Sequence, residues 1–136
     1  MANFRLNADK AIFDVLNVEA LHDLAAGGVF NTIAPQGTAL PFVVYQFISK
    51  VDTHSFDGRY ADSMYLVKAI ADSPWPKPAE DIDTQIDTLM EDAALSITGF
   101  NLLYCRRESD FWFPEDRSGK TLTHVGGTYR IMADQT

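Results

Sequence analysis

The stretch from Val29 to Ile48 constrains the fold of this chain more than any other part of the sequence. Residues 29–33 are rich in β-formers and predict a strand. Residues 34–40 contain proline and glycine and therefore predict a loop. Pro41 then leads a second strand over residues 42–49, at a position that proline tolerates. Both alternating faces of this second strand are apolar, which predicts a strand that is buried on both sides or packed in an assembly.

The helical spacing of apolar residues predicts two helices, one on each side of this region in the chain. The first covers residues 8–16 with Asn7 as its N-cap, and a short turn over residues 18–26 follows it and ends at Gly27-Gly28. The second covers residues 79–95 and has the clearest amphipathic pattern in the chain. Its apolar face consists of Ile82, Ile86, Leu89, Met90 and Ala93.

Further segments have the composition of strands, namely residues 60–71, 100–113 and 120–133. Residues 72–78 hold prolines around Trp75 and predict a stiff connector that is neither strand nor helix. Residues 114–119 predict a charged turn. Gly126-Gly127 interrupts the last strand and indicates a bulge or a bend there.

The order of the expected elements, α, β, β, β, α, β, β, predicts an α+β fold. We expect a single antiparallel-leaning β-sheet with two helices packed on one face. No linker, repeat or low-complexity tract divides the chain, so residues 1–136 are expected to form one domain.

The net charge of the chain limits the kinds of partner that it can bind. The chain has 136 residues, 46% of them apolar, and a net charge of −8, so it can bury a core but is acidic. Phosphates would repel such a chain, so bulk charge predicts no binding to DNA or to an anionic membrane. The same charge suits a protein that sits beside DNA without binding it.

Cysteine usage and hydropathy predict a soluble protein made in the cytosol. Cys105 is the only cysteine, which excludes an internal disulfide and fits a reducing compartment. The first residues lack the apolar core of a signal peptide. The longest apolar run, from Leu40 to Ile48, is too short to span a bilayer.

The residues capable of catalysis form no convincing active site. Cys105 and His124 lie on strands that could pair and form a thiol–imidazole dyad, but a cysteine is more commonly a small buried apolar residue. The three histidines, His22, His54 and His124, have no metal-ligand spacing. We therefore expect no catalytic residue, no metal and no cofactor.

Two other groupings have simple structural interpretations. The carboxylates of Asp81, Asp83 and Asp87 could hold a divalent ion, but they lie mostly opposite the isoleucines of their helix and fit a solvated face. Gly126-Gly127 lacks the Lys-Ser/Thr and the helix start of a phosphate loop.

An aromatic segment is a better indication of function. Strand neighbours point to opposite faces, so Phe111, Trp112 and Phe113 cannot all enter one core. Large aromatic residues are enriched at protein–protein interfaces, so these three residues and Trp75 are candidate interface residues. The alternative is that Trp75 and the proline-rich connector cover the segment. Arg106-Arg107 beside these aromatics resembles a single-strand nucleic-acid binder, but two arginines are a weak signal in so acidic a chain.

Several short motifs, in this order, resemble the tail-terminator, or tail-completion, proteins of long-tailed bacteriophages and prophages. They are Gly28-Val-Phe, Ala34-Pro-Gln-Gly37, Leu40-Pro-Phe-Val-Val44, Asp57-Gly-Arg59, Tyr65-Leu-Val-Lys-Ala69, the helix around Ile82–Leu89 and the closing Gly-Gly-Thr-Tyr-Arg. The similarity covers nearly the whole chain. The long segment 72–78 with Trp75 departs from the family pattern.

The resemblance implies a structural virion protein with no catalytic residues. Such a protein forms a ring, usually a hexamer, that caps the tail tube, joins it to the head connector and lets DNA pass without specific binding. The implied location is the tail or neck of the virion, after assembly in the host cytoplasm. The implied partners are copies of the same chain, the tail-tube protein and the head–tail connector protein, with no membrane.

Three other functions stay open. One is another head–tail connector protein of the same class. The others belong to different classes, a small ligand-binding domain and an enzyme with a cryptic thiol site at Cys105.

Two surfaces are specific candidates within a ring. Residues 51–59 are polar and longer than a hairpin turn needs, so we expect a projecting hairpin with Phe56 as the anchor and Asp57 and Arg59 as its rim. The alternative is that Phe56 folds back onto its own sheet. The carboxylates of Asp83, Asp87 and Glu91 repel one another at i, i+4 spacing, and a tolerated repulsion suggests that they line the lumen of the ring.

Overall fold

The structure is a computed structural model that describes residues 3–56 and 58–135. The elements, in chain order, are α1 (Phe4–Leu16), α2 (Glu19–His22), β1 (Val29–Asn31), β2 (Phe42–Ser55), β3 (Gly58–Ala71), α3 (Lys77–Met90), β4 (Phe100–Arg117) and β5 (Lys120–Gln135). The strands form one five-stranded sheet in the order β1-β2-β3-β5-β4. Only the short β1 pairs in parallel, with β2, while the pairs β2–β3, β3–β5 and β4–β5 are antiparallel.

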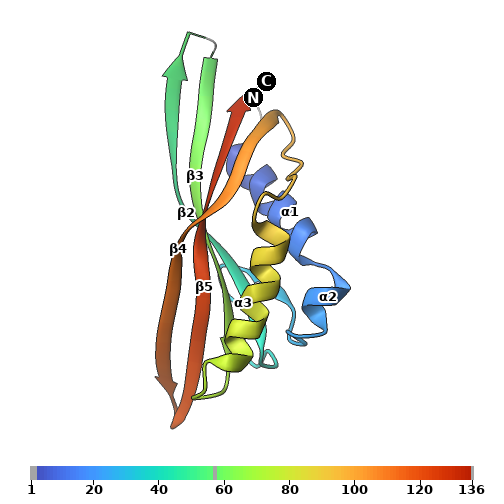
Figure 1. The fold of residues 1–136 in the computed structure, drawn as a ribbon, viewed down its shortest axis with the longest axis vertical. Helices are drawn as coiled ribbons and strands as arrows, with labels where there is room; N and C mark the ends of the chain where they lie inside the picture. Colours follow the sequence, from blue (N-terminus) through green and yellow to red (C-terminus); the bar gives the residue numbers. More distant parts are fainter. Residues whose placement is uncertain (1–2, 57, 136) are drawn as a thin grey trace.

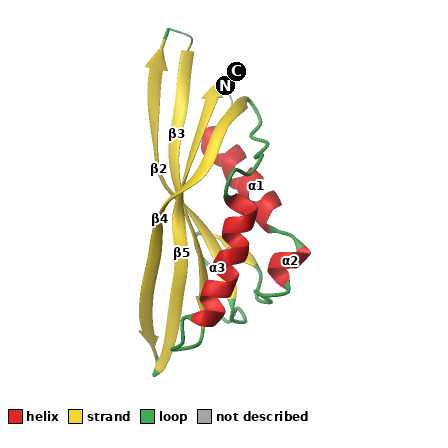
Figure 2. Ribbon diagram, viewed as in Figure 1, coloured by secondary structure: helices red, strands yellow, loops and turns green. Residues whose placement is uncertain are grey.

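The helices all lie on one face of this sheet, and the other face carries none of them (Figure 2). The four long strands make a tall, twisted sheet, with the β2–β3 turn at one end and the β4–β5 turn at the other (Figure 1). This arrangement confirms the expected α+β fold with a mostly antiparallel sheet. None of the described helices is both long enough and apolar enough to cross a membrane.

The core lies between the helices and the sheet. Ile82 and Ile86 of α3 and Ile12 of α1 are fully buried against the inner strands. Two buried tyrosines, Tyr65 and Tyr129, also belong to this core, and each donates its hydroxyl to an aspartate on a helix. Burial of apolar area therefore supplies most of the stability, and these hydroxyls fix how the helices sit on the sheet.

The helix-free face has a small apolar cluster of its own. Val44, Ile70 and Leu122 are buried there, with Leu40 and Phe42 packed against them. The prediction that the second strand buries residues on both faces is confirmed at this point, because Val43 lies in the main core and Val44 lies in this second cluster.

The first helix begins earlier than the sequence pattern predicted. It starts at Phe4, and the side chain of Asn3, not Asn7, accepts the hydrogen bond of the Leu6 N–H at 3.1 Å. Asn7 lies inside the helix and donates its side-chain amide to the Thr98 carbonyl at 3.2 Å. Either asparagine can act as a cap, and the burial of Phe4 in the core favours the earlier start.

Two predicted boundaries were wrong because ladder pairing overrides local composition. The polar residues 51–55 continue β2 opposite β3, so only a tight turn joins the two strands. Residues 114–117 continue β4 through Pro114, which is possible because β4 is an edge strand of the sheet.

The predicted end of the second amphipathic helix was also wrong. The helix was expected to reach residue 95 but ends at Met90. Just after it, Asp92 has a φ of 56° and donates its N–H to the Cys105 carbonyl at 2.8 Å.

The two glycines in β5 mark close packing and not a bulge in their own strand. The irregular pairings lie in β4, between Leu102 and Tyr104 and between Arg107 and Ser109, and in β2. A Cβ at Gly126 would collide with the backbone of β3, and a Cβ at Gly127 would collide with the guanidinium of Arg107. The pair therefore makes room for a neighbouring strand and for one arginine side chain.

Candidate functional site

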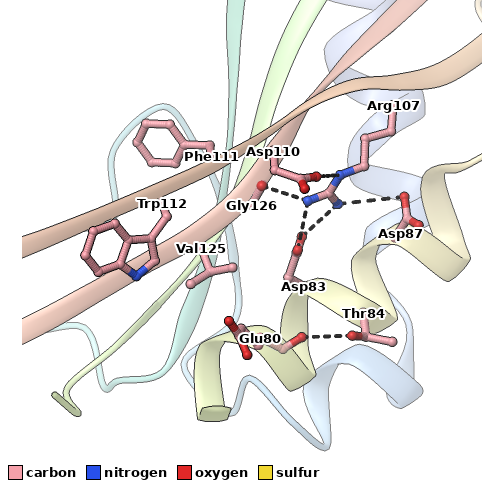
Figure 3. A pocket seen from close by; sticks show the side chains of 10 residues that line it. All are labelled: Glu80, Asp83, Thr84, Asp87, Arg107, Asp110, Phe111, Trp112, Val125 and Gly126. Atoms are coloured by element: carbon pink, nitrogen blue, oxygen red, sulfur yellow. Dashed lines mark hydrogen bonds and ion pairs between the residues drawn. The ribbon is translucent and has the colours of Figure 1, made fainter. Parts of the chain in front are cut away.

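A groove of about 550 Å³ runs between α3 and the sheet, where the middle of β4 lies beside β5 (Figure 3). The apolar side chains of its floor are those of Trp112 and Val125, because the ring of Phe111, which also lines the groove, turns toward Lys68. Three carboxylates on its wall, those of Asp83, Asp87 and Asp110, surround the Arg107 guanidinium, and Glu80 adds a fourth carboxylate to the lining. The groove thus combines an exposed aromatic surface with an excess of negative charge.

Arg107 occupies the middle of the wall and binds α3 to the sheet. Its two terminal nitrogens donate to the two carboxylate oxygens of Asp83 at 3.0 and 2.9 Å, in a bidentate pair. Nη2 also donates to the Gly126 carbonyl at 2.8 Å, and Nε donates to Asp110 at 2.9 Å. The missing side chain of Gly127 leaves the space that the guanidinium fills.

The next turns of α3 extend this network. Asp87 lies 3.7 Å from Nη1 of Arg107 and accepts the Tyr129 hydroxyl at 2.9 Å. Glu91 accepts the backbone N–H of Arg107 at 2.7 Å. Burial alone would lower the pKa of Arg107, but the hydrogen bonds and charge of Asp83 outweigh it and hold that pKa above its ordinary value. Burial raises the pKa of Tyr129, and its hydrogen bond to Asp87 adds to the effect.

This network affects two predictions about the carboxylates of α3, namely that they repel one another and that they lie on a solvated face. Asp83 and Asp87 do not form an uncompensated repelling row, because Arg107 lies between them and the sheet. Asp83 is not on a solvated face either, since its side chain is only 15% exposed. Within residues 3–56 and 58–135, no group of histidine, cysteine and acidic residues is arranged to hold a metal ion. The lumenal position of Asp83, Asp87 and Glu91 stays a prediction.

The aromatic segment divides between the two faces of the sheet, as alternation requires. Trp112 pairs with Val125, which belongs to the main core, so its indole lies on the helix side and is 62% exposed in the groove. Phe111 pairs with Gly126, and the Lys68 ammonium lies 5.6 Å from its ring centre. Phe113 meets the ring of His124 edge to face on the helix-free side.

Trp75 does not cover this segment. Its indole is 75% exposed, and Trp112 and Phe113 also remain exposed, so the alternative of a proline-rich cover is wrong. Exposed aromatics of this size are typical of surfaces that a partner covers. The role of Trp75, Phe111, Trp112 and Phe113 as interface residues stays a prediction.

The tip of the β2–β3 hairpin is the second exposed surface. Phe56 is fully exposed at the tip, so it does not fold back onto the sheet. Arg59 pairs with His54 across the ladder and donates Nε to the Gln135 side chain at 3.2 Å. Asp57, the third residue predicted for this surface, lies outside the described residues. The hairpin projects at the end of the molecule opposite the β4–β5 turn (Figure 1).

Cys105 and His124 do not form a dyad. Cys105 pairs with Ile131 of β5, and seven positions of β5 separate Ile131 from His124, or roughly 23 Å along a strand. Cys105 is fully buried, and burial raises the pKa of its thiol to about 12. The thiol is therefore protonated at neutral pH and is a poor nucleophile.

His124 has a structural partner instead. Its Nε2 lies 2.7 Å from the Glu115 carboxylate, while its Nδ1 is buried with no hydrogen-bond partner. Burial lowers the pKa of His124, and the hydrogen bond from His124 lowers the pKa of Glu115. The pair is consistent with a neutral imidazole that donates Nε2–H to an ionised carboxylate.

The sequence analysis did not find the role of Arg107. It grouped Arg106-Arg107 with the aromatics as a nucleic-acid pattern, whereas the structure turns Arg107 inward and leaves Arg106 on the surface, 3.9 Å from Asp92. The signal that could have indicated it is Gly127, since a glycine in a strand often marks the close approach of another group.

Comparisons with known proteins identify the family to which this architecture belongs. The sequence profile described as "Tail completion protein gp17" matches residues 10–134. The chain belongs to this family. A tail completion protein is a structural component of the phage virion, so the protein is a tail structural protein located in the tail or neck of the particle. The resemblance that the short motifs indicated is therefore confirmed.

A solved structure shares the fold of this tail completion protein. A chain from the structure described as "Virion of native gene transfer agent (GTA) particle" superposes with a TM-score of 0.79 at 14% identity, and the match covers 98% of each chain. At that identity the likeness shows the fold alone. Comparison with curated protein sequences gives no match.

Proposed function

We propose that this tail completion protein forms a closed ring, with six copies expected, that caps the tail tube and joins it to the head connector. The ring lets DNA pass without binding it. The observation that carries the proposal is that the two ends of one long sheet expose different surfaces. One end carries the hairpin tip with Phe56, and the half of the sheet toward the other end carries the groove with Trp112.

Different surfaces on one subunit support a head-to-tail assembly. Contacts of this heterologous kind close into a ring when the rotation between neighbours divides a full turn. The hairpin tip is proposed to dock on a neighbour in the tail, which is a tail-tube subunit, the head connector or the next subunit of the ring. Phe56 is the proposed anchor, with Arg59 and Asp57 on its rim.

We also propose that the protein has no catalytic activity of its own. Supporting this, the Cys105 thiol is buried and lies far along the sheet from the imidazole of His124. Cys105→Ala should leave tail assembly intact, measured as the yield of infectious particles. A folded Cys105→Ala protein that assembles no functional tails would revive the enzyme hypothesis.

The ring itself is tested by cryo-electron microscopy of intact particles and by the native mass of the purified protein. A subunit has a mass of 15.2 kDa, so a ring of six has a mass of about 91 kDa. One closed ring between the tube and the connector supports the terminator function. A ring on the head side of that junction would instead identify another connector protein, and a single copy per tail would exclude the ring.

A further inference from the structure

The hairpin tip has the chemistry of an anchor. Phe56 is the large apolar side chain at the tip, and burying a fully exposed phenylalanine against a partner is favourable. His54 and Arg59 lie opposite each other in the ladder directly beneath it. The ladder therefore places the Arg59 guanidinium, whose Nε also donates to Gln135, opposite an imidazole just beneath the aromatic tip.

The groove has the complementary chemistry. Its floor offers the exposed indole of Trp112 and the side chain of Val125, which suit an aromatic ring. On its rim, the side chain of Asp110 is 90% exposed and Glu80 is also exposed. Only Arg107 offsets the carboxylates of the wall, so the groove favours a cation beside the apolar group it receives.

We propose that the groove between α3 and β4 receives the β2–β3 hairpin tip of a second copy of this chain. Phe56 of one subunit packs on Trp112 and Val125 of the next, and the Arg59 guanidinium near the tip faces the carboxylates of the groove rim. The proposal rests on the ring proposed above and assigns its subunit contact.

The positions of the two surfaces favour a second copy over another tail protein. The tip lies at one end of the sheet and the groove lies in the half toward the other end (Figure 1), so a contact between them links each subunit to the next in one direction. In a closed ring every Phe56 and every Trp112 is then covered. Docking on a partner present in fewer copies would leave some of these aromatics in water.

Disulfide trapping in assembled tails tests the contact. The double variant Phe56→Cys with Asp110→Cys should form a ladder of linked subunits on a denaturing gel under mild oxidation. Cys105 adds no background, because it is buried and its thiol is protonated. The matched control, Phe56→Cys with Lys10→Cys, places the second thiol on the exposed part of α1 and should yield at least tenfold less linked product.

The outcomes separate this contact from the ring. Closed rings that give no ladder, or that link equally well in the control, overturn the contact and leave the ring standing. Linkage of Phe56→Cys to a tail-tube or connector protein also overturns it. Tails that hold no closed ring overturn the ring and the contact together.

A second test of the contact uses alanine variants and needs no engineered cysteines. Phe56→Ala and Trp112→Ala should each weaken ring formation at least tenfold, and the double variant should be no weaker than the worse single variant, because both remove the same contact. Full additivity of the two effects would contradict a shared contact. Melting temperatures within a degree or two of the parent would show that all three proteins fold.

Discussion

Arg107 joins α3 to the sheet through charge-assisted hydrogen bonds in a partly buried setting. Its side chain is 16% exposed and that of Asp83 is 15% exposed, so neither charge has full access to water. A bidentate pair in such a setting is strong when complete and costly when broken. Arg106, the preceding residue, is 64% exposed, with a long contact to Asp92 and its guanidinium 5.3 Å from the Tyr104 ring centre. The two neighbouring arginines therefore allow a matched comparison.

We predict that Arg107→Met lowers the free energy of unfolding by about 3 kcal/mol, because it leaves the Asp83 carboxylate partly buried without a counter-charge. Arg106→Met should change it by less than about 0.5 kcal/mol, as a surface substitution does. Urea unfolding measures both. The double variant Arg107→Met with Asp83→Leu should recover part of the loss, since no charge is then left unpaired. Equal effects of the two arginine variants would contradict this account.

The His124–Glu115 pair makes a second prediction at the scale of single residues. The pKa of His124 is lowered by burial, so the unfolded chain takes up the proton first as the pH falls. The stability from the neutral imidazole is fully present above the unfolded pKa of about 6.5 and is lost as the pH falls through the folded pKa. The lowered pKa of Glu115 acts in the same direction at more acidic pH.

We therefore expect the melting temperature to fall between pH 7.5 and 5.5, and the fall to be smaller in His124→Gln, which keeps a donor for Glu115 but does not titrate. The exposed His54→Gln is the control and should follow the parent at every pH. Differential scanning fluorimetry across this pH range measures the effect. A parent and a His124→Gln protein with parallel curves would show that His124 does not contribute to the acid sensitivity.

At the scale of elements, the β2–β3 hairpin shows what local sequence can and cannot predict. Alternation of apolar residues predicted the first part of β2, residues 42–49, because that part packs against apolar clusters on both faces of the sheet. The residues from Val51 to His54 carry no such pattern, since the ladder with β3 holds them together and their side chains need no core. The same reasoning explains why β4 was expected to end before Pro114.

For a related reason, only part of the candidate site could be predicted from the sequence. The exposure of Phe56 and of the aromatic segment followed from strand alternation and from polar surroundings, which are local properties. The pairing of Arg107 with Asp83 joins residues 24 positions apart, and no local pattern encodes it. The short family motifs were enough to predict the family of the chain. The groove could be recognised only from the structure, because it depends on the register of β4 against β5.

We predict that Phe56→Ala leaves the melting temperature of the subunit within about 2 °C of the parent, because a fully exposed side chain loses no buried contact. The same change should impair head–tail joining, measured as the fraction of tail-bearing particles by negative-stain microscopy. Val43→Ala in the core of β2 is the contrasting variant and should lower the melting temperature by several degrees. A large loss of subunit stability in Phe56→Ala with normal joining would place Phe56 in the fold rather than at a contact.

At the scale of the whole molecule, the subunit contact and the channel compete for the same carboxylates. If the groove receives the neighbour's hairpin, Asp83 and Asp87 lie at the interface between subunits. Glu91 is exposed directly after the end of α3 and does not line the groove. Among the carboxylates predicted for the lumen, it is the one that stays free to face DNA.

Glu91→Lys should therefore slow DNA release from particles, because in a ring of six it changes the charge of the channel by about 12 units and creates contacts with phosphate. Glu91→Gln should release DNA at the parent rate, since its side-chain oxygen can still accept the Arg107 N–H. Glu19→Lys, an equal charge change on the exposed part of α2, should also have no effect. Triggered ejection followed with a DNA-binding dye measures the half-time of DNA release.

The slowing in Glu91→Lys should weaken as the salt concentration rises, because phosphate contacts release counterions. Equal half-times in all variants at low salt would place Glu91 on the outer wall and leave the channel to another surface.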